Sequence, residues 1–202
     1  MKDQFDFYGI QSKQRRDLCK EVIKEFGLPS VEDLDAFMKE AFSCQHREVH
    51  YFAVDVMDKM IKKIPVEFFE TLKYMLLHQS WWDTVDSIAV RHVGTLLKRF
   101  PELLPVMDDW IEDENMWLRR TAILYQLKYK DDTDINRLFD YCKRRAFETE
   151  FFIRKAIGWA LREYSKSNKE SIVDFVEKTP GLSGLSRREA LKWLERRKEK
   201  DF

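Results

Sequence analysis

The chain has 202 residues, of which 44% are hydrophobic, 14% aromatic and 36% charged, a composition that supports one domain with a substantial core and excludes a disordered chain. It contains no run of 18 apolar residues, so we expect no membrane span, and the charged start from Met1 to Asp6 does not resemble a secretory signal. Basic and acidic residues number 36 each, so a net charge of zero does not by itself favour nucleic acid.

Every predicted element is a helix, because apolar residues recur at helical spacing and no strand-like alternation stands out. The first helix is predicted from about Ser12 to Phe26, between turns marked by Gly9 and by Gly27 with Leu28 and Pro29. Eight more helical patterns follow along the chain, at residues 47–60, 66–77, 82–99, 102–111, 117–128, 134–145, 152–164 and 169–177.

Aromatic residues begin three of these helices at an even interval. Trp82, Trp117 and Phe152 lie 35 residues apart, and one step back along the chain reaches Arg47, where another helical pattern begins. Each such helix is followed by a second one, and helix pairs at a fixed period bury their apolar faces against neighbouring pairs. We therefore predict an all-α solenoid of short HEAT-like helix pairs, with residues 1–202 as a single domain.

Charge is unevenly distributed along the chain. Residues 101–118 carry six acids and no Lys or Arg, whereas residues 119–166 carry twelve basic residues against seven acids, and the tail from Gly181 carries seven against four. A concentration of basic charge favours a nucleic-acid-binding surface in the C-terminal half. Ordinary solvated helix faces would produce the same pattern, and that alternative stays open.

Four side chains are predicted to share one surface of the repeats. Counted from each repeat start, Trp82 lies at offset 0, Arg120 at offset 3, Asp86 at offset 4 and Trp159 at offset 7, which is one stripe of a helix. Stacked repeats would then bring two indoles, a carboxylate and a guanidinium onto a common face. The alternative is that both tryptophans belong to the core and that Asp86 pairs with Arg120 for structural reasons.

At these same positions the chain resembles the AlkD-like family of DNA alkylation repair glycosylases. The resemblance covers nearly the whole chain in one order, and two of its segments are specific enough to identify the family. Only seven residues precede Tyr8, where family members often carry a further N-terminal helix, which indicates either a weaker hold on DNA or a shorter subgroup with altered activity. The resembling segments are residues 7–10 (FYGI) with Arg15 and Arg16, 80–88 (SWWDTVDSI), 117–124 (WLRRTAIL), 151–164 (FFIRKAIGWALREY) and 185–190 (LSRREA).

The resemblance implies a right-handed superhelical solenoid with a concave, basic DNA-binding cleft. It also implies the excision of cationic N3- and N7-alkylpurines from DNA by a monofunctional glycosylase that leaves an abasic site. The family's functional aspartate falls on Asp86, its cleft tryptophans on Trp82 and Trp159, and its DNA-contacting arginine on Arg120. Further contacts to the DNA backbone are predicted for Arg119, Arg154, Lys155, Arg162 and Arg188.

These residue types suit that chemistry. A purine that carries a positive charge is already a good leaving group, so the enzyme needs a carboxylate beside the oxocarbenium-like sugar more than an acid beside the base. We expect Asp86 to be this carboxylate. An indole face attracts a cation by about 0.5–2 kcal/mol, and an arginine such as Arg120 clamps a phosphate with two hydrogen bonds.

The sequence predicts neither a metal site nor a cofactor. His46 and His50 are four residues apart, but the glutamate between them is misplaced for a zinc helix, and the scattered Cys19, Cys44 and Cys142 are expected to be reduced thiols. We expect a cytoplasmic monomer that acts on double-stranded DNA containing alkylated purines and does not engage a membrane. The alternative is a non-catalytic HEAT-like repeat scaffold that binds protein or unusual DNA structure.

Overall fold

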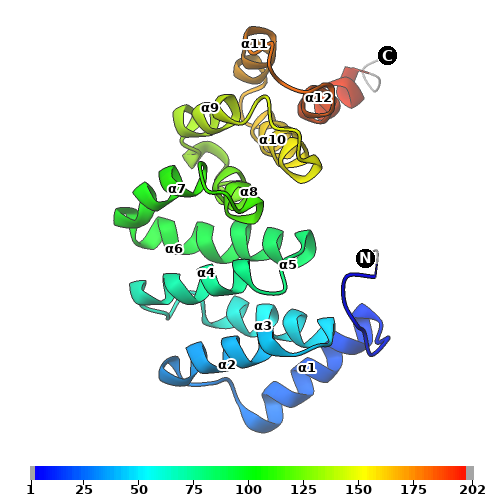
Figure 1. The fold of residues 1–202 in the computed structure, drawn as a ribbon, viewed down its shortest axis with the longest axis vertical. Coiled ribbons are helices and arrows are strands. Elements are labelled where there is room, and N and C mark those ends of the chain that lie inside the picture. Colours follow the sequence, from blue (N-terminus) through cyan, green and yellow to red (C-terminus); the bar gives the residue numbers. More distant parts are fainter. Residues whose placement is uncertain (1–2, 199–202) are drawn as a thin grey trace. The chain divides into compact units, whose positions relative to one another are not determined.

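The computed structural model describes residues 3–198, and the chain divides into two compact units, Met1–Phe100 and Pro101–Phe202. Each unit is described here by itself. Within the described residues the regular elements are all helices (Figure 1), and an isolated β-bridge joins Asp6 to His46. The all-α fold class predicted from the sequence is therefore confirmed, while the prediction of a single domain over residues 1–202 stays a prediction.

The first unit stacks its helices in two layers. In one layer α2 packs on α4, and in the other α3 packs on α5 and on the π-helical segment η2, while α1 contacts α3. Contacts of α2 with α3 and of α4 with η2 join the layers. The elements are α1 (Ser12–Phe26), α2 (Val31–Ser43), α3 (Arg47–Met60), η1 (Val66–Phe68), α4 (Phe69–Leu77), α5 (Trp82–Ser87), η2 (Ile88–Val93) and α6 (Gly94–Arg99).

The second unit repeats this arrangement. Helix α10 packs between α8 and α12 in one layer, and α7, α9 and α11 cover them from the other. The pairs α7 with α8, α8 with α9 and α10 with α11 connect the layers. The elements are η3 (Pro101–Leu103), α7 (Leu104–Trp110), α8 (Met116–Leu124), η4 (Lys130–Asp132), α9 (Ile135–Arg144), α10 (Phe151–Tyr164), α11 (Lys169–Lys178) and α12 (Gly184–Lys198).

Side-chain caps set where several helices begin. Ser30 accepts a hydrogen bond from the third residue of α2, and Asp134 and Asn168 do the same for α9 and α11. Asn115 accepts from the amide of Trp117 at the start of α8. These caps satisfy backbone N–H groups that have no partner inside the helix, so the first turns of these four helices are fixed in place.

Most predicted helices are confirmed with small shifts in their ends. The first helix has the predicted bounds, α3 begins at the predicted Arg47, and α10 begins one residue before the predicted Phe152. Helix α8 ends at Leu124, four residues earlier than predicted, and the predicted helix 82–99 contains the π-helical segment η2. Helices α2 and α12 were not predicted. No described helix is both long enough and apolar enough to cross a membrane.

Candidate functional site

Trp82 and Asp86 lie one turn apart at the start of α5, in the first unit. Trp82 is 45% exposed, and Asp86 is half-buried. The neighbouring Thr84 and Val85 are buried and turn the opposite side of the helix into the core. Residues four apart share a helix face, so the structure places an open indole and a carboxylate together at the surface of this unit.

Arg47, at the first position of α3, is hydrogen-bonded to residues at the start of α5. Its side chain is 0% exposed, and its guanidinium has an acceptor for each of its five N–H groups. Nε and Nη2 donate to the two carboxylate oxygens of Asp83, at 3.1 and 2.7 Å. Nη2 also donates to the Thr84 hydroxyl at 2.7 Å, and Nη1 donates to the Gln79 carbonyl at 2.6 Å and to His50 Nδ1 at 3.0 Å.

The hydrogen bond from Arg47 fixes the tautomer of His50. Because Nδ1 accepts from Arg47, Nε2 carries the proton and donates to the Cys44 carbonyl at 2.9 Å. Burial, aided by the nearby Arg47 charge, lowers the pKa of His50 and keeps it neutral. Both ring nitrogens are thus engaged, which leaves His50 without a lone pair for a metal. Among the described residues, no group of three His, Cys, Asp or Glu side chains is arranged to hold a metal ion.

Asp83 is the second carboxylate near Trp82, and it is occupied by structural partners. Besides the two bonds from Arg47, its Oδ2 accepts from the Tyr51 hydroxyl at 2.5 Å. Burial and this hydrogen bond raise the pKa of Tyr51 to about 12, so the phenol remains a donor throughout the neutral range. Asp83 therefore ties α3 to α5, whereas Asp86 lies one residue beyond Val85 on the face of Trp82.

The N-terminal segment is fastened to the start of α3. The Phe5 ring lies over the Arg47 guanidinium, 4.0 Å from carbon to ring centroid. The Arg47 backbone N–H donates to the Asp6 carbonyl at 2.9 Å. Phe5 thus covers one face of the guanidinium while Asp83 hydrogen-bonds to its edge, and Arg47 links the N-terminal segment to α5.

Glu48, the next residue of α3, binds the same segment through its carboxylate. Its two oxygens accept from the backbone N–H groups of Tyr8, Gly9 and Ile10 at 3.1–3.3 Å. Burial alone would raise the pKa of Glu48, but these hydrogen bonds outweigh burial and lower it. Gly9 has a φ of 79°, a conformation that favours glycine, and Tyr8 stacks on His46 with ring centroids 3.8 Å apart.

In the second unit, the predicted DNA-contacting arginines of α8 are buried. Arg120 is 4% exposed, its guanidinium donates to the Phe152 carbonyl, and it lies over the Phe152 ring. Arg119 is 9% exposed and donates to the carbonyls of Asp113 and Glu114 at 2.7 and 2.8 Å. Both side chains stabilise the turns beside the start of α8 and the start of α10.

Trp159 and the other predicted basic residues lie on α10 and α12. Trp159, Arg154 and Lys155 are half-buried, whereas Arg188 is exposed. Arg154 donates to the Glu148 carbonyl at 2.9 Å. Lys155 donates to the Glu189 carboxylate of α12 at 2.9 Å. Trp159 follows Lys155 by one turn, so an indole and a cation share a face of α10.

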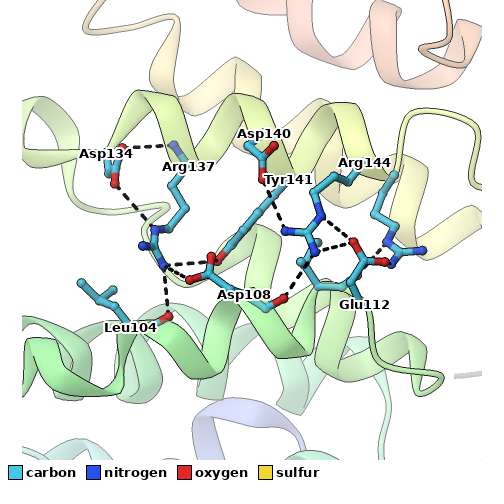
Figure 2. Close-up of polar contacts among 10 residues, drawn as sticks. Leu104, Asp108, Glu112, Asp134, Arg137, Asp140, Tyr141 and Arg144 are labelled. Atoms are coloured by element: carbon cyan, nitrogen blue, oxygen red, sulfur yellow. Dashed lines mark hydrogen bonds and ion pairs between the residues drawn. The ribbon is translucent and has the colours of Figure 1, made fainter.

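The acidic stretch of the sequence meets basic residues of α9 within the second unit (Figure 2). Asp108 accepts from the Tyr141 hydroxyl at 2.7 Å and from Arg137 at 3.1 Å. Glu112 pairs with both Arg144 and Arg145. Part of the basic excess in residues 119–166 is thus used to join α9 to α7, which reduces the cations that remain for a nucleic acid.

The structure brings the predicted residues together in two groups. Trp82 and Asp86 share the start of α5 in the first unit, while Arg119, Arg120, Arg154, Lys155 and Trp159 lie on α8 and α10 in the second. A common surface for all of them stays a prediction. The sequence identifies Arg47 as the start of a repeat but not as the support of α5. The available signal was that Arg47 and Trp82 both lie at offset 0 of their repeats. Sequence reasoning also missed Glu48 and Glu189.

Comparisons with known proteins agree with one another. A family model described as "DNA alkylation repair enzyme" matches residues 1–194. A solved structure, a predicted DNA alkylation repair enzyme from Enterococcus faecalis, is 31% identical with a TM-score of 0.87, over 96% of this chain and 90% of that one. AlkD2 from Streptococcus mutans is 17% identical with a TM-score of 0.69, over 93% of each chain, which shows a similar fold. No curated protein sequence matches.

Proposed function

Because the chain belongs to the DNA alkylation repair enzyme family, we propose that it hydrolyses the N-glycosidic bond of cationic N3- or N7-alkylated purines in double-stranded DNA. The products are the free base and an abasic site. One water is consumed: the glycosidic bond electrons leave with the cationic base and neutralise it, the water oxygen bonds to the sugar carbon, and the proton that this water loses passes to solvent. The reaction requires neither a metal nor a Schiff base from a lysine.

The arrangement at the start of α5 is the observation that supports this proposal. An indole that is 45% exposed has a half-buried carboxylate one turn away on the same helix face. The indole face attracts the cationic base or the sugar as it gains positive charge. The carboxylate of Asp86 stabilises the developing oxocarbenium ion and orients the attacking water.

Asp86 is favoured over Asp83 because Asp83 already has a structural role in the fold. Asp83 accepts three hydrogen bonds from Arg47 and Tyr51, and an approach to a sugar would require breaking them. We assign Asp83 to the support of α5 and Asp86 to the chemistry. Trp159 of the second unit is proposed to contact the substrate as a second indole, and Arg154, Lys155 and Arg188 to contact phosphates of the backbone.

The two buried arginines of α8 are less accessible to DNA than the basic residues of α10 and α12. Arg119 and Arg120 expose little surface and donate to main-chain carbonyls, so a phosphate that reaches them must come close to the first turns of α8 and α10. We propose that they contact DNA in this way, and the salt dependence of binding tests the contact.

Release of 7-methylguanine from a defined duplex tests the proposed function. The wild type should release the free base in single-turnover conditions, and Asp86→Asn should release it at least about tenfold more slowly, since about 1.4 kcal/mol of transition-state stabilisation corresponds to tenfold in rate. The exposed Asp109→Asn is the matched control. Tight duplex binding without base release by the wild type would instead support the non-catalytic scaffold.

A further inference from the structure

A cavity of about 200 Å³ lies in the second unit, beside the ends of α8 and α10. Its inner wall is apolar, because the buried side chains of Ile123, Leu138 and Ala160 line it together with the half-buried Leu127. An apolar cavity of about 150 Å³ accepts benzene, so this one has room for a single ring or a branched alkyl group. None of the described residues that line it belongs to the set predicted to contact DNA.

Polar groups line the outer part of the same cavity. Lys130, Lys166 and Ser167 are exposed, and Thr133 and Tyr164 are half-buried. Among residues 3–198, the ammonium group of Lys130 and the hydroxyl groups of Thr133, Tyr164 and Ser167 have no hydrogen-bond or ion-pair partner. An apolar wall with a few polar groups that are free to bind is typical of a small-molecule site.

The loop that carries Lys130 is held in one conformation. Gln126, which is 3% exposed, accepts from the Asp134 N–H at 3.0 Å and donates to the Asp134 carbonyl at 3.2 Å, so it joins the two ends of the loop. Lys130 has a φ of 55°, a conformation that glycine adopts without strain and other residues adopt at a cost. A lysine at such a position indicates that its side chain has a function.

The charged groups that line the cavity have a positive sum. Lys166 pairs with Glu163 at 2.6 Å, which leaves the charge of Lys130 without a counter-charge inside the cavity. The two acids that follow Lys130 in the loop, Asp131 and Asp132, do not line it. An anionic group at the edge of the cavity would therefore meet an unpaired ammonium group.

We propose that this cavity binds a small anion that carries one ring-sized apolar group. Its phosphate or carboxylate lies at Lys130, and its apolar group packs against Ile123, Leu138 and Ala160. The ammonium group and the neighbouring hydroxyl groups can donate to several oxygens of such an anion, and charge-assisted hydrogen bonds of this kind are strong. Binding at this cavity is independent of the proposed function.

An NMR titration with phenyl phosphate tests the chemistry of the ligand. The wild type should bind this probe with a Kd of about 1 mM, the order expected for a ligand of its size. Phenol lacks the charge and inorganic phosphate lacks the ring, so each should bind at least about tenfold more weakly. No binding of phenyl phosphate, or equally tight binding of inorganic phosphate, would overturn the proposal.

Substitutions of Lys130 test its role in the cavity. Lys130→Gln should weaken phenyl phosphate binding at least about tenfold, because the charged donor is lost. The matched control is Lys128→Gln, which removes the same charge from an exposed residue that does not line the cavity, and it should bind like the wild type. Equal weakening in both variants would show a general effect of charge and contradict the site.

Lys130→Gly separates ligand binding from support of the fold. Because glycine relieves the positive φ, this variant should melt no lower than the wild type and still lose at least about tenfold in affinity for phenyl phosphate. A lysine near helix C-termini also stabilises the helices by its charge. A lower melting temperature with unchanged phenyl phosphate binding would assign Lys130 to that role and refute the site.

An unmodified duplex in excess distinguishes the cavity from the DNA-binding surface, since cations that hold a backbone phosphate can also hold phenyl phosphate. Unchanged binding of the probe to the duplex-saturated protein would support the cavity. Displacement of the probe by the duplex would place it on the DNA-binding surface and overturn the proposal. Release of 7-methylguanine is scored separately, so a protein that binds the probe at Lys130 but releases no base would refute the proposed function alone.

Discussion

The guanidinium of Arg47 and the carboxylate of Asp83 are joined by two hydrogen bonds, of 3.1 and 2.7 Å, between the first turns of α3 and α5. The arginine side chain is fully buried and that of the aspartate is 11% exposed. Asp83 lies between Trp82 and Thr84, so this pair determines where the exposed indole and, one turn on, Asp86 are held. The support of the candidate site therefore comes from a helix 35 residues earlier in the chain.

Replacement of Arg47 by lysine should destabilise the protein strongly. An ammonium group has three donors and cannot reach all five acceptors that the guanidinium satisfies. We expect Arg47→Lys to lower the free energy of unfolding by about 1–3 kcal/mol, the usual cost of leaving buried acceptors without their hydrogen bonds. Urea denaturation measures this change, and the exposed Arg16→Lys is the control. An unchanged free energy would show that α5 does not depend on Arg47.

Substitutions of Asp86 and Asp83 should have different effects, the first on the rate of excision and the second on stability. Asp86→Asn keeps the size of the side chain but removes the charge that faces the sugar, so excision should slow at least about tenfold while duplex affinity stays nearly intact. Asp83→Asn should lower the melting temperature and affect the single-turnover rate less, when both variants are assayed well below their melting temperatures. A larger rate loss in Asp83→Asn would reverse our assignment.

The helical periodicity of the sequence predicted most of the fold because amphipathic helices carry their own signal. The two helices that were missed show its limits. Helix α2 has a Ser30 cap and buried Leu34, Met38 and Phe42 at helical spacing, but it precedes Arg47, the first position of the 35-residue period. Helix α12 is packed against α10 through Gly158 and Glu189, a contact that only the folded chain displays.

The candidate site was predictable in its residues but not in their roles. The sequence places Asp83 and Asp86 equally close to Trp82, and the choice between them depends on Arg47, which is distant in the chain. Likewise, Arg119 and Arg120 are charged residues in a basic stretch, and only packing shows that they are buried. Pairing between helices is set by tertiary contacts that no local pattern encodes.

Neutral lesions should be poor substrates. A cationic purine departs without protonation, whereas uracil or hypoxanthine needs an acid to assist its departure, and the proposed site supplies a carboxylate and indoles. We expect release of uracil and hypoxanthine to be at least about a hundredfold slower than release of 7-methylguanine from the same duplex, the lower end of what acid catalysis contributes. Comparable rates for the three bases would refute the charge-based selection.

Stability should fall as the pH drops from about 6.5 to 5. Burial lowers the pKa of both His50 and His92, so the folded protein keeps them neutral while the unfolded chain binds protons below about 6.5. Each histidine contributes at most about 1.4 kcal/mol per pH unit. Glu48 and Glu189, whose pKa values are lowered, weaken the fold only below about 4.5, so they act in a separate window.

Urea denaturation between pH 5 and 7.5 checks this pH dependence. His92 Nε2 donates to Asp58 at 2.8 Å, and His92→Gln retains a donor but cannot titrate. The variant should lose about half of the dependence on pH in this range. A wild-type free energy of unfolding that is constant from pH 7.5 to 5 would contradict the neutral state of both histidines.

Arg120→Ala should reveal how a buried arginine contributes to DNA binding. The change removes the donor to the Phe152 carbonyl and the guanidinium that lies over the Phe152 ring, so we expect the melting temperature to fall by several degrees. The phosphate contact implied by the family resemblance predicts, in addition, a duplex-binding slope smaller by about 0.9, with no change in sequence preference because phosphate carries no base information. Measured together on one variant, a lower melting temperature with an unchanged slope would assign Arg120 to the packing of α8 against α10.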